Sequence, residues 1–380
     1  MRKVYVDYSA TTYIKDEVLQ EMLPYYNTYF GNPSSIYEEG ILAKEHVLKA
    51  REKIANIIKC KTEEIYFTAS GTEADNTVLK GIMEANKEKG NHLITTKIEH
   101  HAVLNTCKYL EENGYEVTYL NVDNNGRINL NELKNSIKET TVLVSIMAVN
   151  NEIGIIQDLE SIGEICKEKD IYFHSDCVQA IGNIDINVEK LNLDSISVSA
   201  HKFYGPKGIG VMYIKNNIKF NPLIHGGHQE MGKRAGTENV ASIVGMSKAM
   251  EIATINMKEK VKRLKELRDY LMINITNSID NVKLNGSLEN RVSSNLNICI
   301  EDIDCNMMLI ELNKNGISAS CGSACNSSTK IESHVLKAIG LSSKECFNSI
   351  RFSLGEKNTY SDMDYIVYIL KNIVKKHKII

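Results

Sequence analysis

The segment FTASGTEADN, residues 67–76, has the residue types of an anion-binding turn. An apolar run ends here, small residues form a turn, and a helical pattern begins. Backbone N–H groups at such a helix start, together with the hydroxyls of Ser70 and Thr72, suit a phosphate. Ordinary capping of the helix by Ser70 or Thr72 explains the same residues, and this segment alone favours capping.

Two further reactive groups follow apolar runs. The run IYFHSD ends on Asp176, and the run SISVSA is followed directly by His201 and Lys202. A carboxylate at a strand end caps a helix or keeps a pyridine nitrogen protonated. A lysine is usually solvated, but a desolvated one has a lowered pKa and forms a Schiff base with an aldehyde. An anion site, a strand-end Asp and a strand-end Lys together are the anchors that pyridoxal 5'-phosphate requires.

Other ligand sites have weak support. The cluster GPKGIG (205–210) has the wrong spacing for a dinucleotide-binding turn, and no phosphate-binding loop of the G-x-x-x-x-G-K-[ST] type occurs. Cys321 and Cys325 are four residues apart, but no second Cys/His pair has a matching spacing. We therefore expect no metal site.

Short apolar runs rich in β-branched residues alternate with helical patterns along the first two thirds of the chain. This alternation predicts an α/β fold with a mostly parallel sheet covered on both faces. Ligands of such sheets bind beyond the carboxyl ends of the strands. The expected strands are at 63–70, 92–96, 116–122, 141–149, 171–176, 195–200 and 210–214.

The remainder of the chain differs in pattern. Residues 238–274 predict one long helical region, and residues 281–380 mix strands with helices. We expect a large domain over 15–255. A smaller α+β domain would comprise 1–14 and 256–380, with the site between the two domains.

Composition excludes several classes of function. The 380 residues carry a formal net charge of −3, which gives no bulk attraction to nucleic acid or anionic membranes. The first residues, MRKVYVDYSATT, contain no apolar signal segment, and no apolar run has the length of a membrane span. Nine scattered cysteines without a paired framework predict free thiols in a reducing compartment, and hence a cytoplasmic protein without a structural disulfide.

The chain resembles, from end to end, the NifS/IscS-type cysteine desulfurases of the class V aminotransferase family. The motifs that carry the resemblance, in chain order, are YVDYSATT, GNPSS, FTASGTEADN, EHHAVLNTC, VNNEIGIIQD, HSDCVQAIG, SAHKFYGPKGIG, GGHQEMGKRAGTENV, CGSACNSS and IRFSLG. The resemblance implies the pyridoxal-phosphate-dependent transferase fold of type I, with a seven-stranded sheet in the large domain.

It also implies roles for individual residues. Lys202 would bind the cofactor covalently and later move the substrate Cα proton. Asp176 would pair with the pyridine nitrogen, and Gln179 would bond the phenolic oxygen of the ring. His100 would stack on the ring and act as an acid or base, although the sequence alone favours a surface or capping histidine.

The resemblance also implies a phosphate site and a second subunit. Gly71, Thr72, Ser199 and His201 would hold the phosphate. Thr237 would reach the phosphate in the other subunit, which implies a homodimer with shared active sites.

Asn151 and Arg351 would bind the carboxylate of the substrate, L-cysteine. Arg351 is plausible independently, because a guanidinium is a bidentate carboxylate receptor. A surface salt bridge is the commoner role of an arginine.

The resemblance places the nucleophile at Cys325, which would take sulfur from L-cysteine as a persulfide and leave L-alanine. A polar loop suits this step, since the nucleophile must be a thiolate and must reach an acceptor. The expected acceptor is a protein such as an iron–sulfur scaffold. Cys321 stands where many relatives have serine, and the favoured interpretation is a tolerated replacement. The alternatives are a resolving or sulfur-relay thiol and an oxidation-sensitive pair with Cys325.

Three alternatives remain at this point. One is a selenocysteine lyase, and another is a class V aminotransferase that needs no thiol. The third is an inactive sulfur carrier or scaffold, which the joint presence of Lys202, Asp176, His100 and Cys325 argues against.

Overall fold

The computed structural model describes residues 2–322 and 332–378. Its largest element is a seven-stranded sheet with the strand order β2-β8-β7-β6-β5-β3-β4. Strand β8 is antiparallel to both of its neighbours, and the other pairings are parallel. The predicted α/β fold with a mostly parallel sheet is therefore confirmed. The strands are β2 (Ile65–Thr68), β3 (His92–Thr96), β4 (Glu116–Leu120), β5 (Thr141–Ser145), β6 (Tyr172–Asp176), β7 (Ser195–Ser199) and β8 (Gly210–Ile214).

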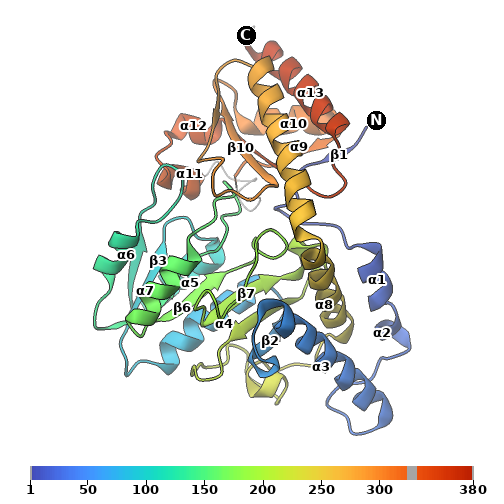
Figure 1. Cartoon of the computed structure of the whole chain (residues 1–380), viewed down its shortest axis with the longest axis vertical. Helices are drawn as coiled ribbons and strands as arrows, with labels where there is room; N and C mark the ends of the chain where they lie inside the picture. The colour runs from blue at the N-terminus through green and yellow to red at the C-terminus, as the bar shows by residue number, and fades with distance from the viewer. Residues whose placement is uncertain (1, 323–331, 379–380) are drawn as a thin grey trace.

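Helices cover both faces of this sheet (Figure 1). Their bounds are α1 (Asp16–Met22), α2 (Pro24–Asn27), α3 (Glu38–Ile58), α4 (Gly71–Ala85), α5 (His101–Glu112), α6 (Leu130–Ser136), α7 (Leu159–Glu168) and α8 (Val240–Ile255). Short 3-10 turns, η1 (Thr62–Glu64), η2 (Ala200–Lys202) and η3 (Glu230–Gly232), lie between them.

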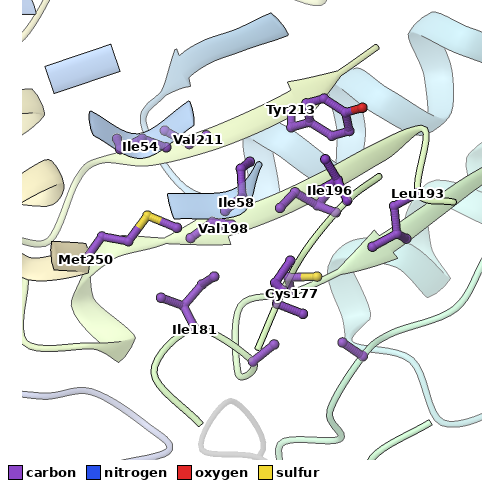
Figure 2. Packing of buried hydrophobic residues seen from close by; sticks show 14 of the residues in the cluster. Ile54, Ile58, Cys177, Ile181, Leu193, Ile196, Val198, Val211, Tyr213 and Met250 are labelled. Carbon is purple, nitrogen blue, oxygen red and sulfur yellow. The ribbon is translucent and has the colours of Figure 1, made fainter. Parts of the chain in front are cut away.

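The two faces of the sheet bury separate apolar clusters, because side chains alternate along each strand. In β8, Val211 and Tyr213 pack into a cluster with Ile54 of α3 and residues of α8, as Figure 2 shows. Met212, between them, packs on the opposite face among residues of α4 and α5. A strand with both faces covered is apolar throughout, as the sequence pattern predicted.

A second unit contains a three-stranded antiparallel sheet in the order β12-β10-β9 and a pair β1-β11. Because β1 pairs with β11, the N-terminal segment packs with the C-terminal part of the chain, and Val4 and Val6 lie in its core. This packing agrees with a division after residue 255, which stays a prediction. The elements are β1 (Val4–Tyr5), β9 (Val282–Leu284), β10 (Asn295–Ile300), β11 (Ile317–Ser318), β12 (Ser349–Ser353), α9 (Met257–Ser278), α10 (Cys305–Lys314), α11 (His334–Ala338), α12 (Ser343–Phe347) and α13 (Tyr360–Lys378).

The helical region expected over 238–274 is two helices rather than one. Asn256, with φ −110° and ψ 30°, leaves the helical conformation and separates α8 from α9. Helix α8 is buried against the large sheet, whereas α9 continues into the second unit, as Figure 1 shows. The change of packing partner at Asn256 accounts for the break.

A buried ion pair fixes the loop that precedes α8. Arg51 of α3 makes two bonds of 2.7 Å to the carboxylate of Glu230, which also accepts the backbone N–H of Phe67 at 2.8 Å. Both charged residues are less than a tenth exposed. Glu230 and Met231 have positive φ angles, which non-glycine residues rarely adopt. The pair thus holds a strained loop against the edge of the sheet.

We expect Glu230→Ala to lower the free energy of unfolding by about 3–5 kcal/mol, because it leaves the Arg51 guanidinium buried without its carboxylate. Glu160→Ala is the control, since the Glu160–Lys190 pair spans 3.5 Å and is about half exposed. An exposed pair contributes about 1 kcal/mol or less. Parallel urea denaturation of the two variants measures the difference, and equal losses would show that the buried pair does not stabilise the fold.

Candidate active site

A cavity of about 270 Å³ lies where several strands of the large sheet end. Strands β6 and β7 reach it at Asp176 and Ser199, and β2 reaches it through the turn before α4. Ten of the predicted site residues line this one cavity: Gly71, Thr72, His100, Asn151, Asp176, Gln179, Ser199, His201, Lys202 and Arg351. The structure therefore brings together residues that are up to 280 positions apart in the chain.

The turn before α4 is a helix cap, as the segment alone predicted, and is also part of the cavity wall. The Ser70 hydroxyl accepts the Glu73 N–H at 3.1 Å, so Ser70 is a helix cap. Ser70, Gly71 and Thr72 also line the cavity. A Cβ at Gly71 would lie 2.7 Å from Cγ2 of Val178, so only glycine leaves the first turn of α4 in place beside the cavity. This helix start offers backbone N–H groups to an anion.

Lys202 enters the cavity from η2, immediately after β7. Its Nζ donates to the backbone carbonyls of Ser9 at 2.6 Å and Ala10 at 2.8 Å. These carbonyls belong to the N-terminal segment, which the sequence analysis did not place at the site. They hold the amine at the cavity wall.

Asp176 is the last residue of β6 and Gln179 follows the strand, and both line the cavity. Asp176 Oδ1 accepts the Val178 N–H at 2.9 Å, and Gln179 donates to the Ser9 carbonyl at 3.0 Å. Burial raises the pKa of Asp176 to about 7, and the nearby Asp75 acts in the same direction. A buried carboxylate with a raised pKa is stabilised as an anion by a cationic partner in the cavity, which is what a pyridinium nitrogen would supply.

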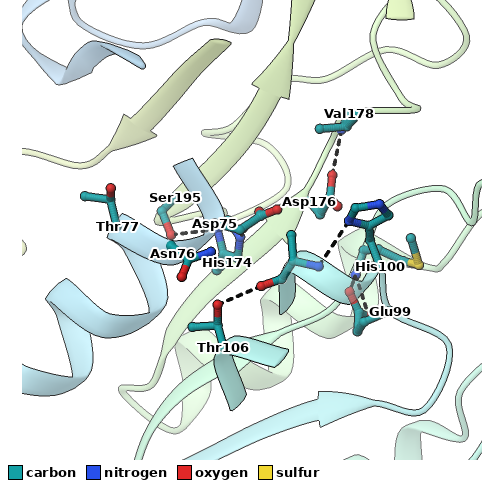
Figure 3. Close-up of polar contacts among 12 residues, drawn as sticks. Asp75, Asn76, Thr77, Glu99, His100, Thr106, His174, Asp176, Val178 and Ser195 are labelled. Carbon is teal, nitrogen blue, oxygen red and sulfur yellow. Dashed lines mark hydrogen bonds and ion pairs between the residues drawn. The ribbon is translucent and has the colours of Figure 1, made fainter. Parts of the chain in front are cut away.

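His100 is both a helix cap and a residue of the cavity wall. It is the N-cap of α5, where its Nδ1 accepts the Ala102 N–H at 3.1 Å (Figure 3). It also lines the cavity. Burial, followed by the charge of Lys202, lowers the pKa of His100 to about 4. His201 lies at the same end and its pKa is also lowered to about 4 by burial. Both imidazoles are thus neutral near pH 7.

Arg351 is buried rather than on the surface, being 1% exposed. Its guanidinium donates to the carbonyl of Asn151 at 2.9 Å and to the carboxylate of Asp7 at 2.7 Å. Its Nε has no hydrogen-bond partner among the described residues. A carboxylate ligand would satisfy this orphaned donor, which fits the predicted substrate-binding role.

One predicted residue that the structure describes is not among those lining this cavity. Thr237 lies in the loop before α8 and is exposed. Cys325 lies outside the described residues. The segments that flank it are close to the site, since Ser320 exchanges two backbone hydrogen bonds with Arg351 and the Ser333 hydroxyl donates to Glu152 at 2.5 Å.

The sequence analysis missed Asp75 and His174, which lie behind Asp176. Asp75 is 1% exposed and lines the cavity, and His174 is fully buried on β6. The available signal was the strand alternation, which places residues 174 and 176 on one face of β6.

The expectation that no structural disulfide forms was wrong. Cys305 and Cys321 form a disulfide, with their Cα atoms 6.0 Å apart. Cys305 begins α10 and Cys321 follows β11, so the packing of this helix beside this strand brings them together. A spacing of 16 residues gave no hint of the pairing. Cys321 is therefore bonded to Cys305, and the prediction of a free thiol at this position was wrong.

Reduction of the denatured protein should raise the number of reactive thiols by two, and Cys305→Ser should abolish that increase. A bridge across 16 residues also stabilises a fold by about 3 kcal/mol on chain-entropy grounds, so the variant should unfold at lower urea. Thiol titration with and without reductant measures the first effect. Cys60→Ser is the control, because Cys60 is a free cysteine; an unchanged thiol number on reduction would contradict the bridge.

Buried carboxyl groups give the apoprotein a pH-dependent stability. Burial raises the pKa of Glu99 to about 8, whereas an ordinary glutamate titrates near 4.5. Between these values the folded state keeps a proton that the unfolded state has lost, so stability decreases as the pH rises. The lowered pKa values of His100, His174 and His201 change the stability only below about pH 6.5, where unfolded histidines take up protons.

The unfolding temperature of the apoprotein should therefore fall from pH 6.5 to pH 8, and it should fall less in Glu99→Gln. Calorimetry over this range tests the expectation. Glu160→Gln, on the surface, should leave the slope unchanged, and a Glu99→Gln curve parallel to that of the unsubstituted protein would refute the assignment.

Comparison with known proteins identifies the class. The model of the class-V aminotransferase family matches residues 4–366. The chain therefore belongs to the class-V aminotransferase family.

Individual relatives indicate which members of this family the chain is similar to. A protein named cysteine desulfurase IscS from Clostridium botulinum is 51% identical over 379 residues, covering 99% of this chain and 96% of the relative. A protein of the same name from Methanosarcina thermophila is 50% identical, covering 99% and 93%. Among solved structures, a NifS-like protein matches with a TM-score of 0.93 and 40% identity over 98% of this chain and all of that one. SspA, solved in complex with cysteine, matches with a TM-score of 0.83 and 37% identity over 93% and 99%.

The cavity fits the cofactor of this family, pyridoxal phosphate. The start of α4, the buried carboxyl of Asp176 and the amine of Lys202 all line the cavity, and these are the groups that would hold its phosphate, ring nitrogen and aldehyde carbon. In the described part of the chain no cluster of three His, Cys, Asp or Glu side chains could hold a metal ion. None of the helices within residues 2–322 and 332–378 is long and apolar enough to cross a membrane.

Proposed function

We propose that this chain is a pyridoxal-phosphate-dependent cysteine desulfurase, which converts L-cysteine to L-alanine and transfers the sulfur to Cys325 as a persulfide. The observation that carries the proposal is the convergence of Lys202, Asp176, His100 and Arg351 on one cavity. Membership of the class-V aminotransferase family and the names of the relatives support it.

The residues that line the cavity would have different roles in the reaction. Gly71, Thr72, Ser199 and His201 would hold the cofactor phosphate, and Lys202 would bind the cofactor covalently. Once bound, pyridoxal phosphate supplies an electron sink for the charge left when a proton leaves the substrate Cα. Lys202, the amine nearest to that carbon in the proposed arrangement, would remove and return the proton.

Further residues would bind and orient the substrate. Arg351 would receive the carboxylate of L-cysteine through its unsatisfied Nε, with Asn151 beside it. His100 is neutral near pH 7, so it can accept a proton from the substrate thiol or return one to it. Asp176 would pair with the ring nitrogen, and Gln179 would bond the ring oxygen.

Cys325 would complete the reaction. Its thiolate would attack the substrate sulfur, so that an S–S bond forms as the substrate Cβ–S bond breaks and the electron pair passes to the carbon that ends as alanine. The described residues on both sides of its segment support this assignment. Ser320 pairs with Arg351, and Ser333 bonds Glu152, the neighbour of Asn151.

We also propose a homodimer in which Thr237 contacts the phosphate bound by the other subunit. Thr237 is exposed and lies outside the cavity of its own chain. Large apolar side chains are exposed near α2 and α3, among them Tyr26, Phe30 and Ile36, as expected of an interface. Mixing Lys202→Ala with Thr237→Ala chains should restore one intact site per mixed dimer.

The persulfide would pass to a thiol on another protein, which we propose to be an iron–sulfur scaffold in the cytoplasm. The support is the resemblance to IscS-type enzymes and the names of the relatives. In a reducing cytoplasm, the Cys305–Cys321 pair would be reversible.

Turnover of L-cysteine tests the proposed function. The purified protein with pyridoxal phosphate and a reductant should release alanine and sulfide in equal amounts. L-selenocysteine serves as the competing substrate. Turnover of L-selenocysteine without turnover of L-cysteine would identify a selenocysteine lyase instead, and transamination without sulfide would identify an aminotransferase.

A further inference from the structure

The polar sides of β6 and β7 face helix α4 behind the cavity. Phe173 of β6 and Ile196 and Val198 of β7 pack into the apolar cluster on the other face. Alternation therefore directs His174 and Asp176 toward α4. Asp75, on the buried side of α4, lies opposite them.

These side chains form a buried chain of polar contacts, which Figure 3 shows. Asp75 Oδ1 lies 3.3 Å from Nε2 of His174, and Nδ1 of His174 lies 3.2 Å from the Ser195 hydroxyl. Asp75 is 1% exposed, and both His174 and Ser195 are fully buried. These contacts are therefore shielded from bulk solvent.

A neutral ring can make both contacts of His174. Burial lowers the pKa of His174 to about 4, so the ring is neutral near pH 7 and has a single N–H. In the tautomer protonated at Nε2, Nδ1 accepts from the Ser195 hydroxyl and Nε2–H donates to Asp75. This arrangement gives the Asp75 carboxylate a fixed donor and a fixed orientation.

Burial raises the pKa of Asp75 itself to about 7, and Asp75 acts on Asp176 through the charge of its ionised form. After burial, Asp75 is the second cause of the raised pKa of Asp176, because two carboxylates in one buried site favour the protonated form. Lys202, a cation on the cavity wall, acts in the opposite direction. Glu99 and Cys177 also face this region, but burial raises the pKa of both, so they are mainly neutral near pH 7.

We propose that Asp75, oriented by His174, is a positioning residue that raises the proton affinity of Asp176 and so keeps the ring nitrogen of pyridoxal phosphate protonated. The inference rests on the proposed pairing of Asp176 with that nitrogen. Asp176 and the ring nitrogen share one proton. The negative charge of Asp75 behind Asp176 makes loss of that proton less favourable than it would be with Asp176 alone.

Ligand discrimination tests this role without measuring activity. The probes are pyridoxal phosphate and its 1-deaza analogue, in which a C–H group replaces the ring nitrogen. Equilibrium dialysis against the apoprotein gives a dissociation constant for each probe. The ratio of the two constants reports the interaction with the ring nitrogen and cancels general damage to the cavity.

The unsubstituted protein should strongly prefer pyridoxal phosphate. Asp75→Asn, which keeps the size and removes the charge, should reduce that preference about tenfold, the equivalent of one pKa unit. His174→Gln should act in the same direction, and it decides the question by the same ratio if Asp75→Asn does not fold. The bound cofactor of Asp75→Asn should also lose its ring proton at lower pH, as followed by its absorbance.

Two other outcomes have distinct meanings. If Asp75→Asn weakens both probes equally, Asp75 is only structural and the inference is overturned. Asp176→Asn should remove the preference altogether. If Asp176→Asn keeps the preference, the proposed pairing of Asp176 with the ring nitrogen is itself wrong.

Discussion

Lys202→Ala should lose the visible absorbance of bound pyridoxal phosphate and reduce turnover of L-cysteine by about 10³-fold or more. The substitution removes both the covalent attachment of the cofactor and the amine that moves the Cα proton, and proton transfer alone contributes about 10²–10⁴-fold. The position of Nζ, within 2.6 Å of the Ser9 carbonyl and inside the cavity, makes replacement by another group implausible. Absorbance spectra and sulfide release measure the two effects.

Lys207→Ala is the matched control, because Lys207 lies in the same turn but is exposed and does not line the cavity. It should keep both the spectrum and the turnover. Retention of the visible band in Lys202→Ala after dialysis would show that another residue carries the cofactor.

Cys325→Ala should abolish sulfide release from L-cysteine, by about 10³-fold or more, while cofactor binding stays unchanged. The attack on the substrate sulfur requires a thiolate, and the ten predicted residues that line the cavity include no cysteine. The described cysteines also argue against a substitute, because Cys107, Cys166 and Cys177 are buried and burial raises the pKa of each.

The control is Cys60→Ser, because Cys60 is the one free cysteine of the described residues that is not buried. It should retain full turnover. Undiminished sulfide release by Cys325→Ala would favour a lyase or aminotransferase that works without a nucleophilic thiol.

Local pattern was sufficient to predict the sheet. Apolar runs such as those of β5 and β8 are buried on both faces, and this burial leaves a nearly continuous apolar signal. The break between α8 and α9 was not predictable in the same way. Both sides of Asn256 are helical in pattern, and the break follows from which unit each helix packs against.

The site was predictable where chemistry coincides with a strand end. Asp176 and Lys202 follow apolar runs, and the topology of a parallel sheet brings such positions to one edge. The interpretations of Ser70 and His100 as caps or as site residues were not exclusive, since each caps a helix and also lines the cavity. A helix N-terminus that binds a ligand needs a cap like any other.

Contacts between distant segments could not be predicted from the sequence. Nothing in the chain pattern pairs Cys305 with Cys321, or Asp75 with His174, because each pair is created by packing between separate elements. The same holds for the Ser9 and Ala10 carbonyls that hold Lys202. Backbone groups have no sequence signature at all.

The most direct test of the central claim is a single turnover with sulfur-labelled L-cysteine, followed by peptide mass spectrometry without reductant. The proposed function predicts one labelled sulfur atom on the peptide that contains Cys325, together with one alanine for each active site. Alanine formation with the label absent from Cys325, or with the label on Cys321 in the Cys325→Ala variant, would contradict it.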